Sequence, residues 1–232
     1  MNPTMKIMSE QAIFVSFGDI IDEQIHTQIQ RAIALVEAAQ IDGIIEIVSG
    51  YTNFCVYYEP LRMKKNVAHL DGNSIAEKTI TLLQHILKEE QHHAEENGRL
   101  IEIPVRYGGQ YGPDLAEVAA YHNMSESEVV QRHTSVDYLV YMLGFAPGFP
   151  FLGGLDKAIA TPRKQTPRLK IEAGAVGIAG EQTGVYPLAT PGGWQIIGQT
   201  DMALFLPNET APTLLRAGDR VRFVAVEGDA QW

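Results

Sequence analysis

The chain has 232 residues, of which 45% are hydrophobic and 20% are charged, and its formal net charge is −10 at pH 7. This length and composition predict one large or two modest globular domains. An acidic chain repels nucleic acid and anionic membranes, so neither is an expected partner. No run approaches the ~20 apolar residues of a membrane-spanning helix, the N-terminus lacks an apolar signal segment, and the single cysteine, Cys55, cannot form an internal disulfide. We therefore expect a cytoplasmic protein.

The first hundred residues predict the order strand, helix, strand, strand, helix, strand. The expected strands are residues 12–17, 44–48, 54–58 and 100–107. Apolar residues spaced by three or four positions, from Ile21 to Val36, predict the first helix. Ser74 and Glu77 form a capping box that begins the second helix. This order is typical of a ferredoxin-like split βαβ domain, which we place at residues 1–98.

The remaining residues, 99–232, have a different character. A loop at 108–114 precedes two short helices, for which Asp114 and Ser125 are the expected N-caps. Between Gly144 and Thr200 lie 11 of the 21 glycines and 6 of the 12 prolines. Short strand-like runs alternate with these breakers, which is typical of a β-sandwich or a closed barrel. The expected strands are residues 138–143, 175–179, 185–188, 195–197, 203–206 and 221–226.

The glycine- and proline-rich run is also interleaved with aromatic residues. Glycine lets a backbone approach a ligand closely, proline rigidifies the chain, and aromatic rings form apolar walls. The run is therefore a candidate ligand site, although a barrel that only needs tight corners has the same composition. The aromatic residues are Phe145, Phe149, Phe151, Tyr186 and Trp194.

Four cations, Arg163, Lys164, Arg168 and Lys170, fall within eight residues that contain no acid. Arginine binds carboxylate or phosphate through a bidentate fork, and lysine binds them as a point charge. A repeated Thr-Pro-Arg, at 161–163 and 166–168, fixes both backbones and favours an anion site over a solvated turn. His133, at the end of the second short helix, is a candidate proton carrier or a cap of that helix.

Other sites receive less support. His85, Glu89 and His92 share one helical face, but the surrounding charges indicate a solvated surface, and we expect no metal site. The sequence has no P-loop, dinucleotide-binding, zinc-protease or nucleophile-elbow motif. Covalent catalysis by this chain alone is therefore not expected.

Long segments of the second half carry a family resemblance: YMLGFAPGFPFLGGLD (141–156), TPRKQTPRLKIEAGAVGIAGEQTGVYPLATPGGWQIIGQT (161–200) and AGDRVRF (217–223). With VRYGGQYGPDL (105–115) upstream, they closely resemble the family of 5-oxoprolinase B subunits (PxpB), also called the KipI family or allophanate hydrolase subunit 1. The resemblance implies a small α/β domain followed by a cyclophilin-like β-barrel, an α+β protein overall.

The family resemblance also implies a function. The chain would be a subunit, inactive alone, of an ATP-dependent enzyme that opens 5-oxoproline to glutamate. Its partners would be a lactam-utilisation protein (PxpA) and a KipA-like sister subunit (PxpC), with ATP and Mg²⁺ bound at the level of the complex. Two alternatives stay open: a regulator that binds a sporulation-type histidine kinase, and a component of a urea carboxylase or allophanate hydrolase.

Site residues follow from the same resemblance. We expect catalytic roles for His133, Arg168 and the neighbouring Lys170. The expected substrate- or ATP-binding residues are Phe149, Arg163, Gln182, Gly184, Tyr186, Pro191, Gly192, Gly193 and Trp194. Three positions depart from the family pattern: Glu172 where proline is frequent, Ala175 where serine is common, and Gln199 where arginine is common.

Overall fold

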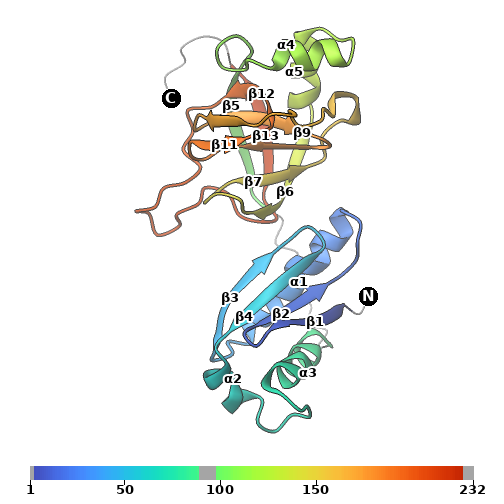
Figure 1. Cartoon of the computed structure of the whole chain (residues 1–232), viewed down its shortest axis with the longest axis vertical. Helices are drawn as coiled ribbons and strands as arrows, with labels where there is room; N and C mark the ends of the chain where they lie inside the picture. The colour runs from blue at the N-terminus through green and yellow to red at the C-terminus, as the bar shows by residue number, and fades with distance from the viewer. Residues whose placement is uncertain (1–2, 89–97, 227–232) are drawn as a thin grey trace. The chain divides into compact units, whose positions relative to one another are not determined.

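The computed structural model describes residues 3–88 and 98–226. The chain divides into two compact units, Met1–Glu96 and Asn97–Trp232, each with a hydrophobic core of its own (Figure 1). The boundary expected from the sequence lay between residues 98 and 99. Within the described ranges no helix is both long enough and apolar enough to span a membrane.

The first unit is a four-stranded antiparallel sheet covered by helices. Its strands are β1 (Thr4–Ser9), β2 (Ala12–Ser16), β3 (Ile44–Ser49) and β4 (Asn53–Tyr58), in the order β1-β2-β4-β3. Strands β2 and β3 both run antiparallel to β4, which lies between them, so they are parallel to each other. Helix α1 (Glu23–Ala38) connects β2 to β3. This is the predicted split βαβ arrangement, and the ferredoxin-like expectation is confirmed.

One strand of the expected sheet was wrong. The strand next to β2 is β1, at the start of the chain, whereas residues 100–107 form β5 (Leu100–Tyr107) of the second unit. The sequence concealed β1 because it is an edge strand whose apolar Ile7 and Met8 are exposed, so its pattern does not alternate clearly. The element order alone does not say which strands pair.

The helices of the first unit pack on one face of the sheet. Ile29 and Val36 of α1 and Leu83 of α3 (Ile75–Lys88) are buried in one core with the inward side chains of the strands. The short α2 (Pro60–Asn66) adds Met63 to that core. The predicted start of α3 is confirmed in part, because the Ser74 hydroxyl accepts the Glu77 backbone N–H at 3.1 Å.

The second unit is a closed barrel, in strand order β10-β7-β6-β13-β5-β12-β9. Its remaining strands are β6 (Asp137–Leu143), β7 (Pro150–Gly153), β9 (Ala175–Ala179), β10 (Gln182–Val185), β12 (Gln195–Gln199) and β13 (Arg220–Ala225). Only β5 and β13 pair in parallel among these strands. The barrel, rather than the sandwich, is therefore the correct alternative.

Helices α4 (Leu115–Tyr121) and α5 (Glu126–Thr134) lie together at one end of the barrel (Figure 1). The Ser125 capping box of α5 is confirmed. Asp114 is the N-cap residue of α4, as expected, but its side chain makes no capping hydrogen bond. Its carboxylate has other partners, described below.

Two of the expected strands differ in the structure. Residues 203–206 form no strand and make only one isolated bridge, Phe205 with Thr213. The strand expected at 185–188 ends at Val185, shortly before Pro187, which has no N–H to donate to a ladder. A two-stranded ribbon of β8 (Arg168–Ile171) and β11 (Thr190–Gly192) was not predicted. A short 3-10 turn, η1 (Lys157–Ile159), precedes the arm that carries β8.

Candidate functional site

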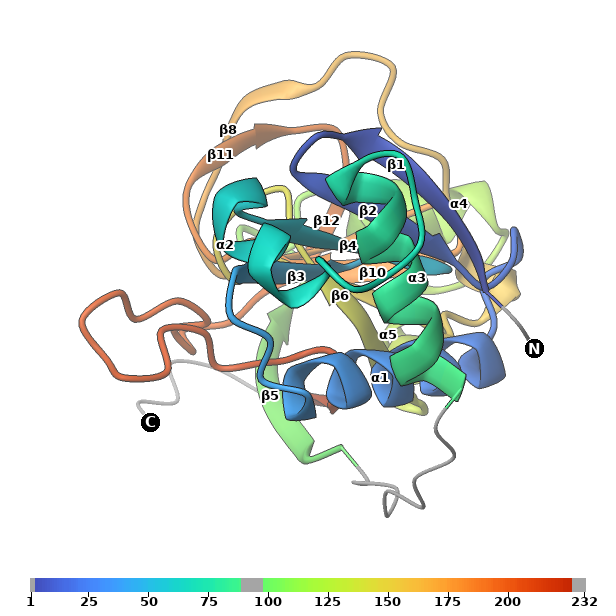
Figure 2. The ribbon, with the colours of Figure 1, turned by 90° about the horizontal axis from the view of Figure 1, so that it is seen from below.

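The glycine- and proline-rich run forms the barrel strands β7, β9, β10 and β12, and its remaining residues pack on the outside of the barrel. The paired strands β8 and β11 (Figure 2) contribute Ile171 to an apolar cluster separate from the barrel interior. In β9, Val176 and Ile178 belong to the barrel interior, whereas Ala175 and Ala179 belong to the second cluster. Because side chains alternate along a strand, the second cluster lies on the outer face of the barrel wall. We call it the outer aromatic cluster; its buried members are Ala146, Phe149, Ile171, Ala175, Ala179, Tyr186, Trp194 and Ile196.

Three predicted binding residues bury one another in this cluster. The rings of Phe149, Tyr186 and Trp194 are at most 5% exposed. The Phe149 ring stands edge-on to that of Tyr186 at 5.1 Å and to that of Trp194 at 5.4 Å, between centroids. Such perpendicular pairs add stability beyond the area that they bury. These rings therefore form a packed layer and not the open apolar walls that the sequence suggested.

The interleaved glycines serve the same packing. A Cβ atom at Gly184 would lie 3.1 Å from ring carbons of both Phe149 and Trp194. A Cβ atom at Gly192 would lie 2.4 Å from the Tyr186 hydroxyl. The two glycines thus let the chain's own rings approach the backbone, the role that the sequence analysis had assigned to a ligand.

One aromatic residue at this cluster points outward. Phe145 is 67% exposed, and its ring touches Phe149 and Tyr186 edge-on. Its φ of +68° is the left-handed region, which costs a residue with a side chain about 1–2 kcal/mol. Residues in strained backbone conformations occur frequently at binding sites, where the surrounding structure holds a side chain in a required position.

A buried carboxylate organises the basic arm. The Asp114 side chain is 3% exposed and accepts two hydrogen bonds from the Arg168 guanidinium, at 2.8 and 2.6 Å. It also accepts the Ile196 backbone N–H at 2.6 Å and lies 3.0 Å from the Lys164 ammonium. Burial raises the pKa of Asp114, but the hydrogen bonds from Arg168, Ile196 and Lys164 outweigh burial, and the net pKa is lowered. We call this arrangement the Asp114 clamp.

The ion pairs account for three of the four cations. Lys164 bridges Asp114 and Glu117, Arg168 is held by Asp114, and Lys170 pairs with the exposed Glu172 at 2.8 Å. No carboxylate pairs with Arg163 among the described residues. Its guanidinium lies over the Trp194 ring, 5.9 Å from the centroid. Of the arm's cations, Arg163 is therefore the one whose charge is open to an anion.

His133 lies in the barrel interior, fully buried and stacked on Phe223. Its Nε2 lies 2.8 Å from the Thr183 hydroxyl, and its Nδ1 lies 2.8 Å from the Tyr107 hydroxyl. Thr183 donates its one proton to the Gly177 carbonyl, so Nε2–H must donate to Thr183 and Nδ1 must accept from Tyr107. Burial lowers the pKa of His133 to about 3. This placement favours a neutral structural histidine over the expected proton carrier or helix cap.

The other expected residues lie around the cluster. Pro191 is exposed, and Gly193 accepts the Lys164 backbone N–H through its carbonyl at 2.7 Å. Gln182 is half-buried at the start of β10. Of the departures from the family pattern, Ala175 is buried in the cluster, and Gln199 donates its amide to the Ala173 carbonyl. Apart from His133, the expected residues lie in or near the outer aromatic cluster, but most of them pack against the protein itself.

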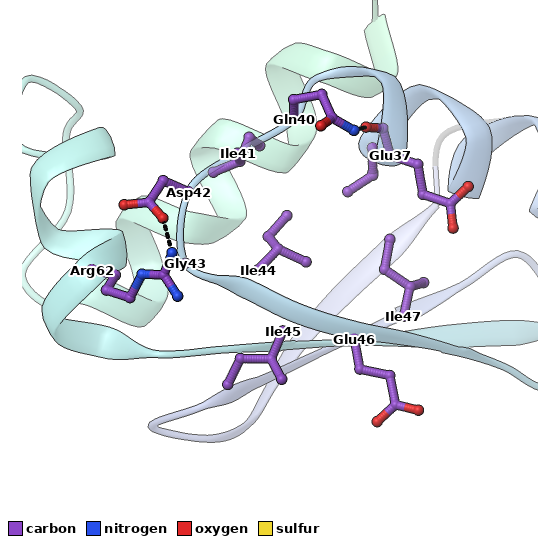
Figure 3. A pocket seen from close by; sticks show the side chains of 11 residues that line it. Glu37, Gln40, Ile41, Asp42, Gly43, Ile44, Ile45, Glu46, Ile47 and Arg62 are labelled. Atoms are coloured by element: carbon purple, nitrogen blue, oxygen red, sulfur yellow. Dashed lines mark hydrogen bonds and ion pairs between the residues drawn. The ribbon is translucent and has the colours of Figure 1, made fainter. Parts of the chain in front are cut away.

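A separate open hollow of about 610 Å³ occurs in the first unit, between the end of α1 and the free edge of β3 (Figure 3). Arg62 pairs with Asp42 at its rim, and isoleucines of β3 line it. It contains none of the residues expected from the sequence. Of the considered metal ligands, Glu89 and His92 lie outside the described residues, and no metal-binding group of side chains occurs among those described.

Comparison with known proteins agrees with this architecture of a split βαβ unit followed by a closed barrel. The family model "Carboxyltransferase domain, subdomain C and D" matches residues 3–215. A protein of Bacillus subtilis (strain 168), named as the B subunit of 5-oxoprolinase, is 48% identical over 94% of this chain and 91% of its own length. A protein of the same name from Escherichia coli O157:H7 is 60% identical over 78% of each chain. The chain belongs to this carboxyltransferase-domain family and, within it, to the group of 5-oxoprolinase B subunits.

Solved structures include longer chains. The crystal structure of TTHA0988 matches with a TM-score of 0.77 and 35% identity, and covers 94% of this chain but only 40% of its own. This chain thus spans less than half the length of that relative. The Kluyveromyces lactis urea amidolyase has a TM-score of 0.72 at 22% identity, which shows a shared fold, and this chain spans 15% of it.

Proposed function

We propose that this chain is a non-autonomous subunit of an ATP-dependent 5-oxoprolinase, which opens 5-oxoproline to glutamate together with a lactam-utilisation protein and a KipA-like sister subunit. The relatives named as 5-oxoprolinase B subunits support membership of such an enzyme. The proposed role of this chain in the reaction rests on the ion pairing of the basic arm. It leaves one guanidinium, that of Arg163, without a carboxylate partner among the described residues.

The proposed reaction needs activation because an amide carbonyl is a poor electrophile. Transfer of the γ-phosphoryl group of ATP to the lactam oxygen makes the ring carbon electrophilic. A first water adds to that carbon and the ring C–N bond breaks with protonation of the nitrogen; a second water releases phosphate. The products are glutamate, ADP and phosphate. The protein's part in such a reaction is to position the substrate and to stabilise charge.

In this proposal Arg163 holds the carboxylate of 5-oxoproline. A single guanidinium above an indole face suits a monoanion with a small flat ring, since arginine binds carboxylate bidentately and stacks on aromatic rings. A triphosphate needs several cations and Mg²⁺. Lys164, Arg168 and Lys170 are already paired with carboxylates, so we place ATP and Mg²⁺ on another subunit. Arg168 then acts by holding the arm, and His133 and Lys170 have no direct contact with substrate.

The test is 5-oxoproline-dependent ATP hydrolysis by the reconstituted mixture of this chain and its two partners. For Arg163→Gln we expect kcat/KM for 5-oxoproline to fall about 10- to 100-fold, the effect of one lost charged hydrogen bond, with the KM for ATP unchanged. Lys157→Gln is the matched control, because its exposed ion pair with Glu181 contributes little, and we expect a change within about twofold. Equal rates with and without this chain would contradict the proposal. A rise in the KM for ATP alone would contradict the role of Arg163.

A further inference from the structure

The β8–β11 ribbon exposes apolar side chains next to the charged Lys170, whose side chain is 66% exposed. Leu169 of β8 is 93% exposed, although it lies within a strand. The ladder pairs Thr190 with Ile171 and Gly192 with Arg168, so the exposed Pro191 stands opposite Leu169 and Lys170. Single exposed apolar residues are ordinary, but a group of them marks an interaction surface.

Phe145 borders the same part of the molecule. Its ring contacts Tyr186, and the Tyr186 hydroxyl lies directly beneath Gly192 of the ribbon. Phe145 and Pro191 therefore border the outer aromatic cluster, Leu169 lies two residues from its buried member Ile171, and all three side chains are exposed. The left-handed backbone at Phe145 lies in the tight turn between β6 and β7, where the Ala146 N–H donates to the Gly144 carbonyl at 2.8 Å.

The ribbon also offers strand edges. Within the described second unit, β8 and β11 pair only with each other, so each has one edge with unpaired backbone groups. Pro191 removes a donor from β11, which leaves β8 as the better edge for an added strand. The Asp114 clamp and the buried Ile171 anchor β8 to the rest of the second unit. A rigid surface of this kind loses little conformational entropy when a partner binds.

We propose that this surface, consisting of Phe145, Leu169, Pro191 and the free edge of β8, is where the sister subunit of the complex docks. The proposal rests on the proposed function, since it assumes that the chain works as one component of a larger enzyme. The same unit occurs as a separate protein in Bacillus subtilis and as 40% of the longer TTHA0988 chain, in which further polypeptide is joined to it covalently. We take that further polypeptide to be the counterpart of the sister subunit.

Docking at this surface has a chemical consequence. Arg163, which lies over Trp194 of the same cluster, would be enclosed by the incoming partner. Its charge would then act in a drier environment, where an ion pair with a substrate carboxylate is stronger than in water. The ligand site would be completed only between the two proteins. We expect the partner to present an apolar pocket for Leu169 and Phe145 and no cation opposite Arg163.

The experiment uses biolayer interferometry to measure how the full-length chain binds the purified sister subunit, with size-exclusion chromatography and light scattering on each component. We expect Leu169→Asp and Phe145→Gly each to weaken binding by about 30-fold or more, as for interface hot spots. Leu169→Asp should keep its melting temperature, because Leu169 packs against almost nothing. Phe145→Gly should change it little, because glycine accepts the positive φ and this offsets the lost edge contacts with Phe149 and Tyr186. The control is Leu61→Asp, a leucine that is 74% exposed on α2; we expect unchanged binding.

The outcomes separate the two proposals. If the wild-type chain shows no binding to the sister subunit, the proposed function fails, and this surface with it. If the wild-type chain binds and both variants bind equally well, the surface alone is overturned. The surface is also overturned if Leu169→Asp dissociates a homodimer of this chain without affecting the sister subunit, because the occupant would then be a second copy.

Discussion

His133 illustrates how an ionisable side chain is kept neutral inside a barrel. Its two ring nitrogens are satisfied by one donor and one acceptor, the hydroxyls of Tyr107 and Thr183. Burial raises the pKa of Tyr107 well above its usual value, so this hydroxyl keeps the proton that it donates. Protonation of His133 would place a second N–H against Tyr107 and a charge in the barrel interior, and both changes oppose folding.

This geometry predicts a pH dependence of stability. The pKa of folded His133 is about 3, below its usual 6.5, so below pH 6.5 the unfolded chain takes up a proton that the folded chain does not. The contribution of neutral His133 to the free energy of unfolding is therefore fully present above pH 6.5 and is lost as the pH falls toward 3. Urea unfolding at pH 7.5, 6 and 5 should show a smaller decline for His133→Gln than for the wild type. The exposed His69→Gln should follow the wild type, and equal declines for all three proteins would contradict the assignment.

Among the elements, the arm from Thr161 to Ile171 depends most on one residue. The Asp114 clamp ties this arm to β12 through Ile196 and to the start of α4. Asp114 is buried and accepts hydrogen bonds from two cationic side chains and a backbone N–H. Protonation or removal of this carboxylate therefore destabilises the folded protein strongly. The position of Arg163 on the arm therefore follows from a residue that lies about fifty positions earlier in the chain.

Removal of the clamp should be destabilising. For Asp114→Ala we expect a loss of about 3–5 kcal/mol in the free energy of unfolding, because Arg168 and Lys164 lose their shared buried partner. Glu117→Ala is the control, since Glu117 is 66% exposed and pairs with Lys164 at the surface, and we expect a loss below about 1 kcal/mol. The lowered pKa of Asp114 means that the clamp's stabilisation is present above the unfolded pKa and is lost as the pH falls through the folded pKa. Similar losses for the two variants at pH 7 would contradict the clamp.

The elements also show what a single sequence can and cannot reveal. Helical spacing found α1 and α3, and strand-like runs found β2, β4, β6 and β9, because these patterns are local. Asp114 appeared to be a helix cap because it precedes Leu115 and has Glu117 three residues later. Nothing local indicates its pairing with Arg168, 54 residues away. The aromatic residues and glycines of the outer aromatic cluster were also evident in the sequence, but we interpreted them as a ligand site. The alternation of side chains along a strand does not reveal whether the outer face of the barrel is already covered by other parts of the chain.

At the scale of the whole molecule, two separate cores predict two unfolding events. Ile13 belongs to the core of the first unit and Ile103 to that of the barrel, and both are fully buried. Each change to alanine should destabilise its own unit by about 2–5 kcal/mol. In differential scanning calorimetry we expect Ile13→Ala and Ile103→Ala to shift different transitions. One transition that both variants shift equally would contradict independent cores.

The origin of β1 has a consequence for how the protein is made. Because the edge strand of the first sheet comes from the start of the chain, that unit has all of its strands once Tyr58 has been synthesised and its last described helix by Lys88. The barrel is different, since β5 pairs with β13, the last strand of the described chain. On the ribosome the first unit can therefore fold before the barrel, which stays open until β13 has emerged. Until β13 is synthesised, β5 and β6 lack the strand that lies between them and closes the barrel.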